Sequence, residues 1–148
     1  MKQKVFLIGL IFGMFFMGSL QAQVVSVPNK SEKHFAKKYP GATNINWTNN
    51  VVEYTCKFSF NGRDYKAFYH MDGNWDYTIM YMQESELPEA VKTSVAKSRI
   101  SDWKPKSCVA VENNKGKKTF RVEREKGAEE MYIFYDKDGK EVKSTYKL

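Results

Sequence analysis

The chain has 148 residues, of which 24 are lysine or arginine and 17 are aspartate or glutamate, and its formal net charge is +7. This length corresponds to one domain, and it allows an adequate hydrophobic core without the help of disulfide bonds. The positive charge is compatible with contact to anionic lipids, polysaccharide or acidic proteins, but we interpret most of the lysines as solvated surface.

Residues 1–22 have the features of a secretory signal peptide. Lys2 and Lys4 form a positive start, residues 5–17 are almost entirely apolar, and small residues follow up to the expected cleavage point. The apolar run is short for a membrane span, and no cysteine stands directly after the expected cleavage point, so that lipid attachment is not expected. We therefore expect residues 23–148 to form a periplasmic or secreted protein without stable membrane insertion. Nucleic acid is not an expected partner in that compartment.

Two segments have the apolar spacing and the end signals of short helices. The first helix is expected over residues 30–39, with Phe35 and Tyr39 on one face. The second helix is expected to begin near Ser85 and Pro88. Three apolar residues recur there at the helical spacing i, i+4 and i+8, namely Leu87, Val91 and Val95.

Residues 55–82 are rich in aromatic residues and are divided by two turn signals, Asn61-Gly62 and Asp72-Gly73. Asn-Gly between alternating apolar residues is a strong hairpin signal, because both central residues must accept a positive φ. A two-residue turn at this point predicts these cross-strand pairs: Phe60 with Arg63, Phe58 with Tyr65, Cys56 with Ala67, and Tyr54 with Tyr69. We expect this side of the sheet to pack against a helix and the other side to face water.

The second turn signal decides which side of the sheet the following strand presents. We favour a type I turn over residues 71–73, with glycine in the left-handed bulge position. This turn predicts Trp75, Tyr77 and Ile79 on the packed side of the sheet. A tighter turn would turn all three side chains to the other side.

The pattern of the first half returns in the second half at a constant spacing, so that Tyr54 corresponds to Phe120 and Tyr69 corresponds to Tyr135. Strands are expected over residues 108–111, 119–125, 130–135 and 141–146, with Phe120 opposite Tyr135, Val122 opposite Ile133, and Arg124 opposite Met131. The sequence therefore predicts an α+β fold, a tandem repeat of a helix plus a four-stranded antiparallel meander, with the helices on one face of the sheet. The two repeats are expected over residues 29–82 and 85–148.

Several segments of the chain, taken in order, carry a resemblance to a known family. They are residues 35–42, 45–47, 60–65, 72–75, 85–91 and 135–140, which read FAKKYPGA, INW, FNGRDY, DGNW, SELPEAV and YDKDGK. The chain thereby resembles the exported bacterial proteins described as PepSY-like or beta-lactamase-inhibitor-like. The resemblance implies a tandem repeat, a periplasmic location, no enzymatic activity, and binding to or inhibition of another protein. It implies no particular site residues.

The residue types that catalysis or metal binding requires are scarce and scattered in this sequence. His34 and His70 are both expected at the surface, and Cys56 is expected to be a buried thiol that behaves as a small apolar residue. Residues 72–76 begin like a calcium loop, but the glycine and glutamate that such a loop needs further on are missing. No nucleophile, phosphate-loop or metal-ligand motif occurs. We therefore expect a protein that is not an enzyme and that uses no cofactor and no metal.

The two cysteines, Cys56 and Cys108, are expected on strands that lie apart in the sheet. A disulfide bond requires Cα atoms within roughly 7 Å of each other. We therefore predict that these cysteines are not bonded to each other.

The side of the sheet away from the helices is the candidate binding surface. Strand alternation places these residues there: Lys57, Lys66, Phe68, His70, Arg121, Tyr132 and Phe134. Exposed aromatic residues on a sheet are typical of a recognition surface. Alternatively, these rings cover one another across neighbouring strands, or the loop around Trp103 covers them.

The function that we expect is that of a non-enzymatic periplasmic binding module. The surface would engage an envelope protein or peptide, with Phe68, His70, Tyr132 and Phe134 as anchors and the basic residues around them. The alternative is that the same surface binds a small molecule, a glycan or an envelope polymer. The sequence leaves the oligomeric state open.

Overall fold

The computed structural model of the protein describes residues 25–147. The predicted signal peptide, residues 1–22, lies outside the described residues. Among residues 25–147, no helix combines the length and the apolar character that are needed to cross a lipid bilayer.

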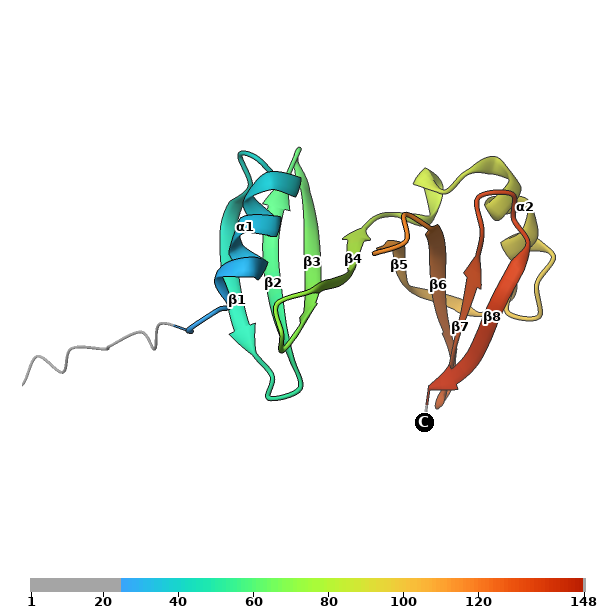
Figure 1. Ribbon diagram of the computed structural model, residues 1–148. Helices are drawn as coiled ribbons and strands as arrows, with labels where there is room; N and C mark the ends of the chain where they lie inside the picture. Colours follow the sequence, from blue (N-terminus) through green and yellow to red (C-terminus); the bar gives the residue numbers. More distant parts are fainter. Residues whose placement is uncertain (1–24, 148) are drawn as a thin grey trace, which may run out of the picture.

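Helices are few in this part of the chain, and strands make up most of it. The elements in chain order are α1 (Asn29–Lys38), β1 (Thr43–Asn49), β2 (Glu53–Phe60), β3 (Arg63–His70), β4 (Trp75–Tyr81), the 3₁₀-helix η1 (Glu84–Glu86), α2 (Glu89–Ala96), β5 (Lys104–Asn113), β6 (Lys118–Lys126), β7 (Glu129–Tyr135) and β8 (Glu141–Lys147). The strands form one eight-stranded antiparallel sheet whose spatial order, from β1 to β8, is the chain order. The sheet is strongly twisted, so that α1 lies in front of its strands in Figure 1 whereas α2 lies behind β8.

The fold class predicted from the sequence is wrong. β4 pairs directly with β5, from Tyr77 opposite Asn113 to Tyr81 opposite Val109. The structure is therefore mostly one eight-stranded antiparallel sheet with two short α-helices, and not a tandem repeat of a helix plus a four-stranded meander. The physical reason is that turn signals set where strands begin and end, whereas a sheet continues wherever two unpaired strand edges satisfy each other's backbone groups.

The predicted hairpin registers are confirmed on both sides of this junction. Asn61 and Gly62 have φ angles of 50° and 73°, as a two-residue turn with two left-handed positions requires. In the first half, the observed pairs are Phe60 with Arg63, Phe58 with Tyr65, Cys56 with Ala67, and Tyr54 with Tyr69. In the second half, they are Phe120 with Tyr135, Val122 with Ile133, and Arg124 with Met131.

An irregularity in β4 changes the side on which most of its residues lie. Tyr69 of β3 pairs with Trp75, whereas the preceding residue of β3, Phe68, pairs with Tyr77. β4 thereby accommodates one extra residue, and the residues beyond it are turned to the opposite face. The prediction for this strand is therefore correct for Trp75 and wrong for Tyr77 and Ile79.

Cross-strand pairs show that both α-helices cover the same face of the sheet, because directly opposite residues point to the same side. Phe58, in the core under α1, pairs with Tyr65, which pairs with Met80. Met80 in turn pairs with Ala110, which lies in the core under α2. We call this side the helix face. The other side, which carries Phe68, is called the bare face because neither described α-helix covers it.

The core under α1 is aromatic. The ring of Phe35 meets the ring of Phe58 at a centroid distance of 4.8 Å and an interplanar angle of 89°, and Tyr39 lies 4.6 Å from the same ring. Phe58 also stacks on Tyr65 at 5.3 Å. Edge-to-face and stacked arrangements of this kind stabilise aromatic clusters. The two helix residues that the sequence predicted to share a face, Phe35 and Tyr39, are both buried here.

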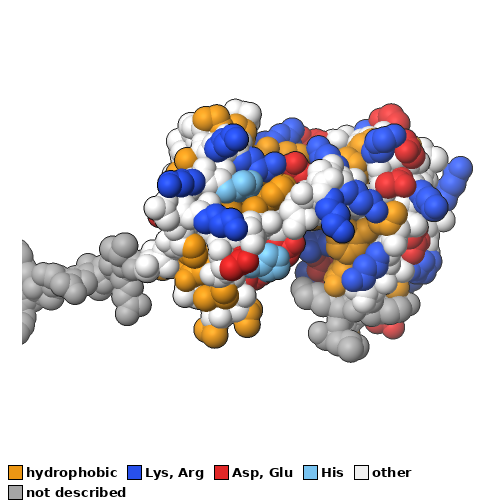
Figure 2. All heavy atoms as spheres, in the orientation of Figure 1, with side chains coloured by type: hydrophobic (Ala, Val, Ile, Leu, Met, Phe, Trp, Pro, Cys, Tyr) orange, Lys and Arg blue, Asp and Glu red, His pale blue; other side chains and the backbone are white. Residues whose placement is uncertain are grey.

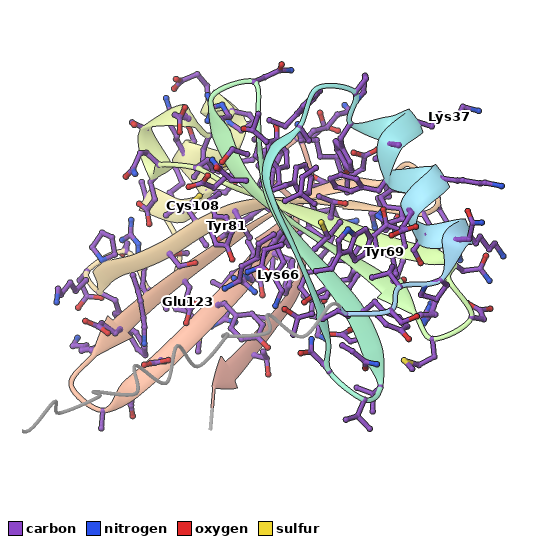
Figure 3. The ribbon with its side chains drawn as sticks, turned by 90° about the vertical axis from the view of Figure 1, so that its left-hand side faces the viewer. Lys37, Lys66, Tyr69, Tyr81, Cys108 and Glu123 are labelled. Atoms are coloured by element: carbon purple, nitrogen blue, oxygen red, sulfur yellow. The ribbon has the colours of Figure 1, made fainter. Side chains whose placement is uncertain are left out.

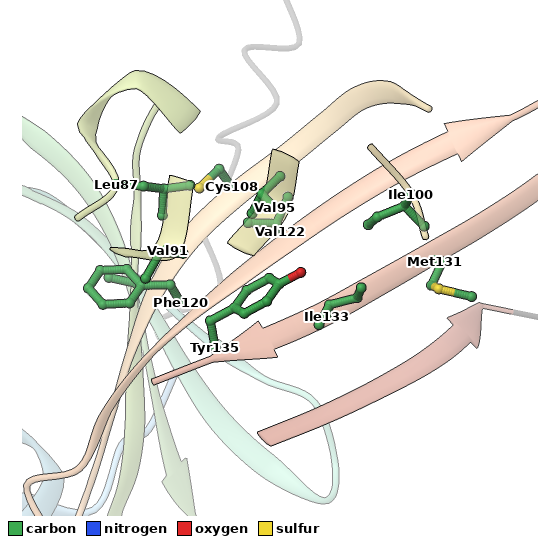
Figure 4. Close-up of a cluster of buried hydrophobic side chains, with 11 residues drawn as sticks. Leu87, Val91, Val95, Ile100, Cys108, Phe120, Val122, Met131, Ile133 and Tyr135 are labelled. Carbon is green, nitrogen blue, oxygen red and sulfur yellow. The ribbon is translucent and has the colours of Figure 1, made fainter. Parts of the chain in front are cut away.

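The core under α2 is mainly aliphatic (Figure 4). Leu87, Val91 and Val95, which were predicted from their helical spacing, all belong to this cluster. They pack against β5, β6 and β7, where Val122 and Ile133 are completely buried. α2 itself begins at Glu89, after η1, so that the helix is shorter than the sequence predicts.

Gly139, in the turn between β7 and β8, is packed closely against α2. A Cβ atom at this position would overlap the carbonyl oxygen of Ala90 and would lie 2.7 Å from Oγ of Ser94. Gly139→Ala should therefore lower the free energy of unfolding by about 2–5 kcal/mol, from left-handed strain of about 1–2 kcal/mol plus overpacking of about 1–3 kcal/mol. Urea denaturation measures this loss.

Gly116→Ala is the matched control for this prediction. Gly116 has a φ of +73°, close to the +80° of Gly139, but a Cβ atom there would meet nothing within 4 Å. This substitution should cost only the conformational strain, about 1–2 kcal/mol. Equal losses for the two variants would show that the contact with α2 contributes nothing.

Candidate functional site

The candidate surface lies on the bare face, and all of its predicted residues come from β2, β3, β6 and β7. The structure places these residues there: Lys57, Lys66, Phe68, His70, Arg121, Tyr132 and Phe134. Figure 3 shows Tyr69 on the side of α1, with Lys66 and Glu123 on the other side of the sheet. The alternation predicted from the sequence therefore holds for every one of these residues.

The N-terminal half of the bare face carries a stacked aromatic pair. The rings of Phe68 and Tyr77 lie 4.2 Å apart at an interplanar angle of 15°. Nζ of Lys66 lies 4.7 Å from the centroid of the Phe68 ring, within the range of a cation–π contact. Sequence reasoning missed Tyr77, because the irregularity in β4 that turns it to this face has no recognisable signal in the sequence.

The C-terminal half carries a second aromatic pair. Tyr132 and Phe134 meet edge to face, with centroids 5.7 Å apart. The guanidinium carbon of Arg121 lies 5.7 Å from the centroid of Tyr132, and Nη2 of Arg121 lies 4.0 Å from Oε2 of Glu123. In Figure 2, hydrophobic side chains of this half are surrounded by lysine and arginine side chains. Tyr132, like Phe68, thus has a basic residue against its ring.

The strands between the two pairs carry buried residues on the bare face. Val109 of β5 is completely buried and Ile79 of β4 is 7% exposed. Val109 pairs with Tyr81 on one side and with Arg121 on the other, so that larger neighbours cover it. The bare face is therefore not a flat solvated surface. It consists of a buried apolar centre with half-buried aromatic pairs beside it.

Two predicted members of the site stand apart from these pairs. His70 is exposed at the end of β3, where its Nε2 lies 3.9 Å from Oδ1 of Asp76. Lys57 is exposed on β2. Within residues 25–147, no aromatic contact joins the Phe68 pair to the Phe134 pair.

His34, which the sequence places at the surface, is packed on the helix face instead. Its ring stacks on Trp75 at 5.1 Å and 20°, and its Nδ1 lies 3.1 Å from Oη of Tyr69. Partial burial, followed by the charges of Lys38 and Lys37, lowers the pKa of His34 below its usual value. His34 therefore contributes to packing rather than to the candidate surface.

The bare face carries glutamates that pair with basic residues, such as Glu123 with Arg121 and Glu125 with Lys104, and it also carries lysines without a described acidic partner. Among the described residues, the ammonium groups of Lys57, Lys66 and Lys143 form no ion pair. Lys143 pairs across the strands with Phe134, and Lys66 lies against Phe68. A partner that presents carboxylates beside apolar side chains is complementary to this arrangement.

The described residues contain no cluster of three or more histidine, cysteine, aspartate or glutamate side chains that could hold a metal ion. Cys56 and Cys108 are both free, as predicted, and both are buried. β3 and β4 separate their strands in the sheet. Burial raises the pKa of both thiols to about 12. Neither thiol is therefore available as a nucleophile at neutral pH.

Comparison with known proteins relates this geometry to several solved structures. No family model and no curated protein matches the chain. A BLIP-like protein from Bacteroides fragilis NCTC 9343 is 23% identical with a TM-score of 0.76, over 84% of this chain and 89% of that one. A DUF2874 family protein from Bacteroides ovatus ATCC 8483 is 19% identical with a TM-score of 0.76, over 83% and 89% of the two chains.

A third similar structure comes from Bacteroides eggerthii DSM 20697 and is described provisionally as a periplasmic protein. It is 21% identical with a TM-score of 0.74, over 82% of this chain and 90% of that one. These likenesses establish a fold similar to that of BLIP-like proteins, which agrees with the beta-lactamase-inhibitor-like part of the resemblance seen in the sequence. The PepSY-like part stays a prediction.

The buried thiols lead to a direct test. We expect the folded protein to react slowly with a thiol reagent at about pH 8, because thiols whose pKa is near 12 hold almost no thiolate there. After unfolding in denaturant without reductant, both cysteines should react at once. Fast labelling of the folded protein, or fewer than two reactive thiols in the unfolded monomer, would contradict the structure.

Proposed function

We propose that the protein is a non-enzymatic periplasmic binding module that engages another envelope protein or a peptide segment through the bare face. The observation that carries this proposal is the presence of two half-buried aromatic pairs, Phe68 with Tyr77 and Tyr132 with Phe134, on the face without α-helices. The fold similarity to a BLIP-like protein supports the binding role. The fold similarity to a protein that is described provisionally as periplasmic supports the location.

The chemistry of the surface suits a protein partner. Aromatic residues next to arginine or lysine are the residue types that most often dominate protein interfaces. The rings of each pair already contact each other in the free protein, so that little side-chain freedom is lost on binding. The basic residues Lys57, Lys66 and Arg121 favour a partner whose contact surface is acidic around an apolar centre.

Binding of a small molecule or a glycan by the same face is the second candidate. A cavity of about 280 Å³ lies beside Phe134, and it is lined also by Val111, Thr119 and Lys143. An aromatic ring with hydroxyl and ammonium groups nearby suits a sugar ring. A thermal shift with a glycan panel in the absence of any protein partner would favour this candidate over the first.

Truncation of the aromatic anchors tests the proposal. Phe68→Ala and Phe134→Ala should each weaken capture of the envelope partner by about 1 kcal/mol or more, the loss typical of interface anchors. The measurement is crosslinking and capture from envelope extract, with the wild-type protein and the variants side by side.

Phe58→Ala is the control, because Phe58 is 3% exposed and lies in the core under α1. It should reduce the free energy of unfolding by roughly 3–5 kcal/mol, the loss expected for a core cavity. Phe68→Ala should reduce it less, because Phe68 is only half-buried. If Phe68→Ala unfolds the protein as severely as Phe58→Ala does, the Phe68 pair is part of the core and the proposal fails.

A further inference from the structure

The middle of the helix face contains a cavity that neither core cluster fills. It has a volume of about 280 Å³ and lies where β4 and β5 join the two halves of the sheet. The α1 side contributes Lys38 and Tyr39 at the end of the helix, and the sheet contributes the rest of the lining: Phe60, Tyr65, Thr78, Met80, Ala110, Glu112 and Lys118.

Three aromatic rings form one wall of this cavity. The centroid of Tyr39 lies 5.6 Å from that of Phe60 and 6.2 Å from that of Tyr65, and Phe60 lies 6.2 Å from Tyr65. The ring of Phe60 meets the other two rings edge to face, at 74° and 69°, and the rings of Tyr39 and Tyr65 are tilted by 44°. Met80 and Ala110 also line the cavity, so that rings and aliphatic side chains together offer apolar surface to a ring-shaped ligand.

A buried hydroxyl pair supplies a hydrogen-bond donor to the cavity. Oη of Tyr39 and Oγ1 of Thr78 lie 2.8 Å apart, and Nε1 of Trp75 donates to Oγ1 of Thr78 at 3.0 Å. The two hydroxyls hold two protons, and only one of them is used in the bond between them. The second proton has no acceptor among residues 25–147, although Tyr39 and Thr78 are only 7% and 4% exposed. An unused buried donor is costly, so an acceptor brought by a ligand would be favourable.

The charges at the rim favour an anion. Nζ of Lys38 is paired with Oε1 of Glu112 at 3.0 Å. Lys118 lies opposite Glu112 across the strands, but it forms no ion pair with any described carboxylate. The rim therefore holds one ammonium group more than it holds carboxylates.

The geometry points to a binding site for a small single-ring carboxylate in this cavity. The ring packs on the wall of Tyr39, Phe60 and Tyr65, while the carboxylate accepts hydrogen bonds from Lys118 and from the free hydroxyl proton. The volume of about 280 Å³ lies at the lower limit of pockets for drug-sized ligands, which limits the ligand to a small molecule. This site lies on the face opposite the surface proposed for the protein partner, so the two proposals stand or fall separately.

The site is tested by titrating isotope-labelled protein with phenylacetate and following its amide signals by nuclear magnetic resonance. Saturable shifts are expected at Thr78, Met80 and Ala110, which line the cavity. Phenethylammonium, which has a similar ring and the opposite charge, should give no saturable shift at these positions. Shifts elsewhere only, no saturation, or equal binding of the two probes would overturn the proposal.

Two substitutions at the rim should change the affinity in opposite directions, which a merely structural role would not produce. Lys118→Met should raise the Kd for phenylacetate by roughly tenfold, as expected for the loss of a charge-assisted hydrogen bond. Glu112→Gln should lower the Kd, because it removes the carboxylate and frees the ammonium group of Lys38. Lys97→Met, at an exposed lysine that follows α2 and does not line the cavity, is the matched control and should leave the Kd unchanged. An unchanged Kd in both rim variants would refute the site.

Discussion

The pairing of β4 with β5 is the constraint on which the rest of the structure depends. It joins eight strands into one sheet, which at a strand spacing of about 4.8 Å is roughly 34 Å wide. An α-helix with its side chains covers only about 10–12 Å of such a sheet. Two short helices therefore leave the whole bare face and the middle of the helix face without helical cover.

The bare face compensates for the absence of helices with its own side chains. Phe68 stacks on Tyr77 and Tyr132 meets Phe134, so that each ring covers part of its neighbour. Val109, in the centre of this face, is completely buried without a helix above it. The rings remain half-buried, which leaves apolar area that a partner can cover at a gain in free energy.

On the helix face, side chains of α1 and α2 fill two cores, and a cavity remains between these cores. The aromatic cluster under α1 ends at Tyr39 and Tyr65, and the cluster under α2 ends near Ala110. The cavity lies between these limits, with the ion pair of Lys38 and Glu112 linking α1 to β5 across it. The structure thus has aromatic pairs spread over one face and, on the other face, a cavity between the two cores.

The sequence by itself determined the features that depend on neighbouring residues. Asn61-Gly62 defined a hairpin and its register, and the helical spacing of Val91 and Val95 identified one face of α2. Only the tertiary structure decided what depends on contacts between distant segments. The continuous sheet comes from the meeting of two strand edges, and the position of Tyr77 comes from an irregularity between β3 and β4. Neither has a local signal, because backbone pairing between strand edges depends little on which side chains the strands carry.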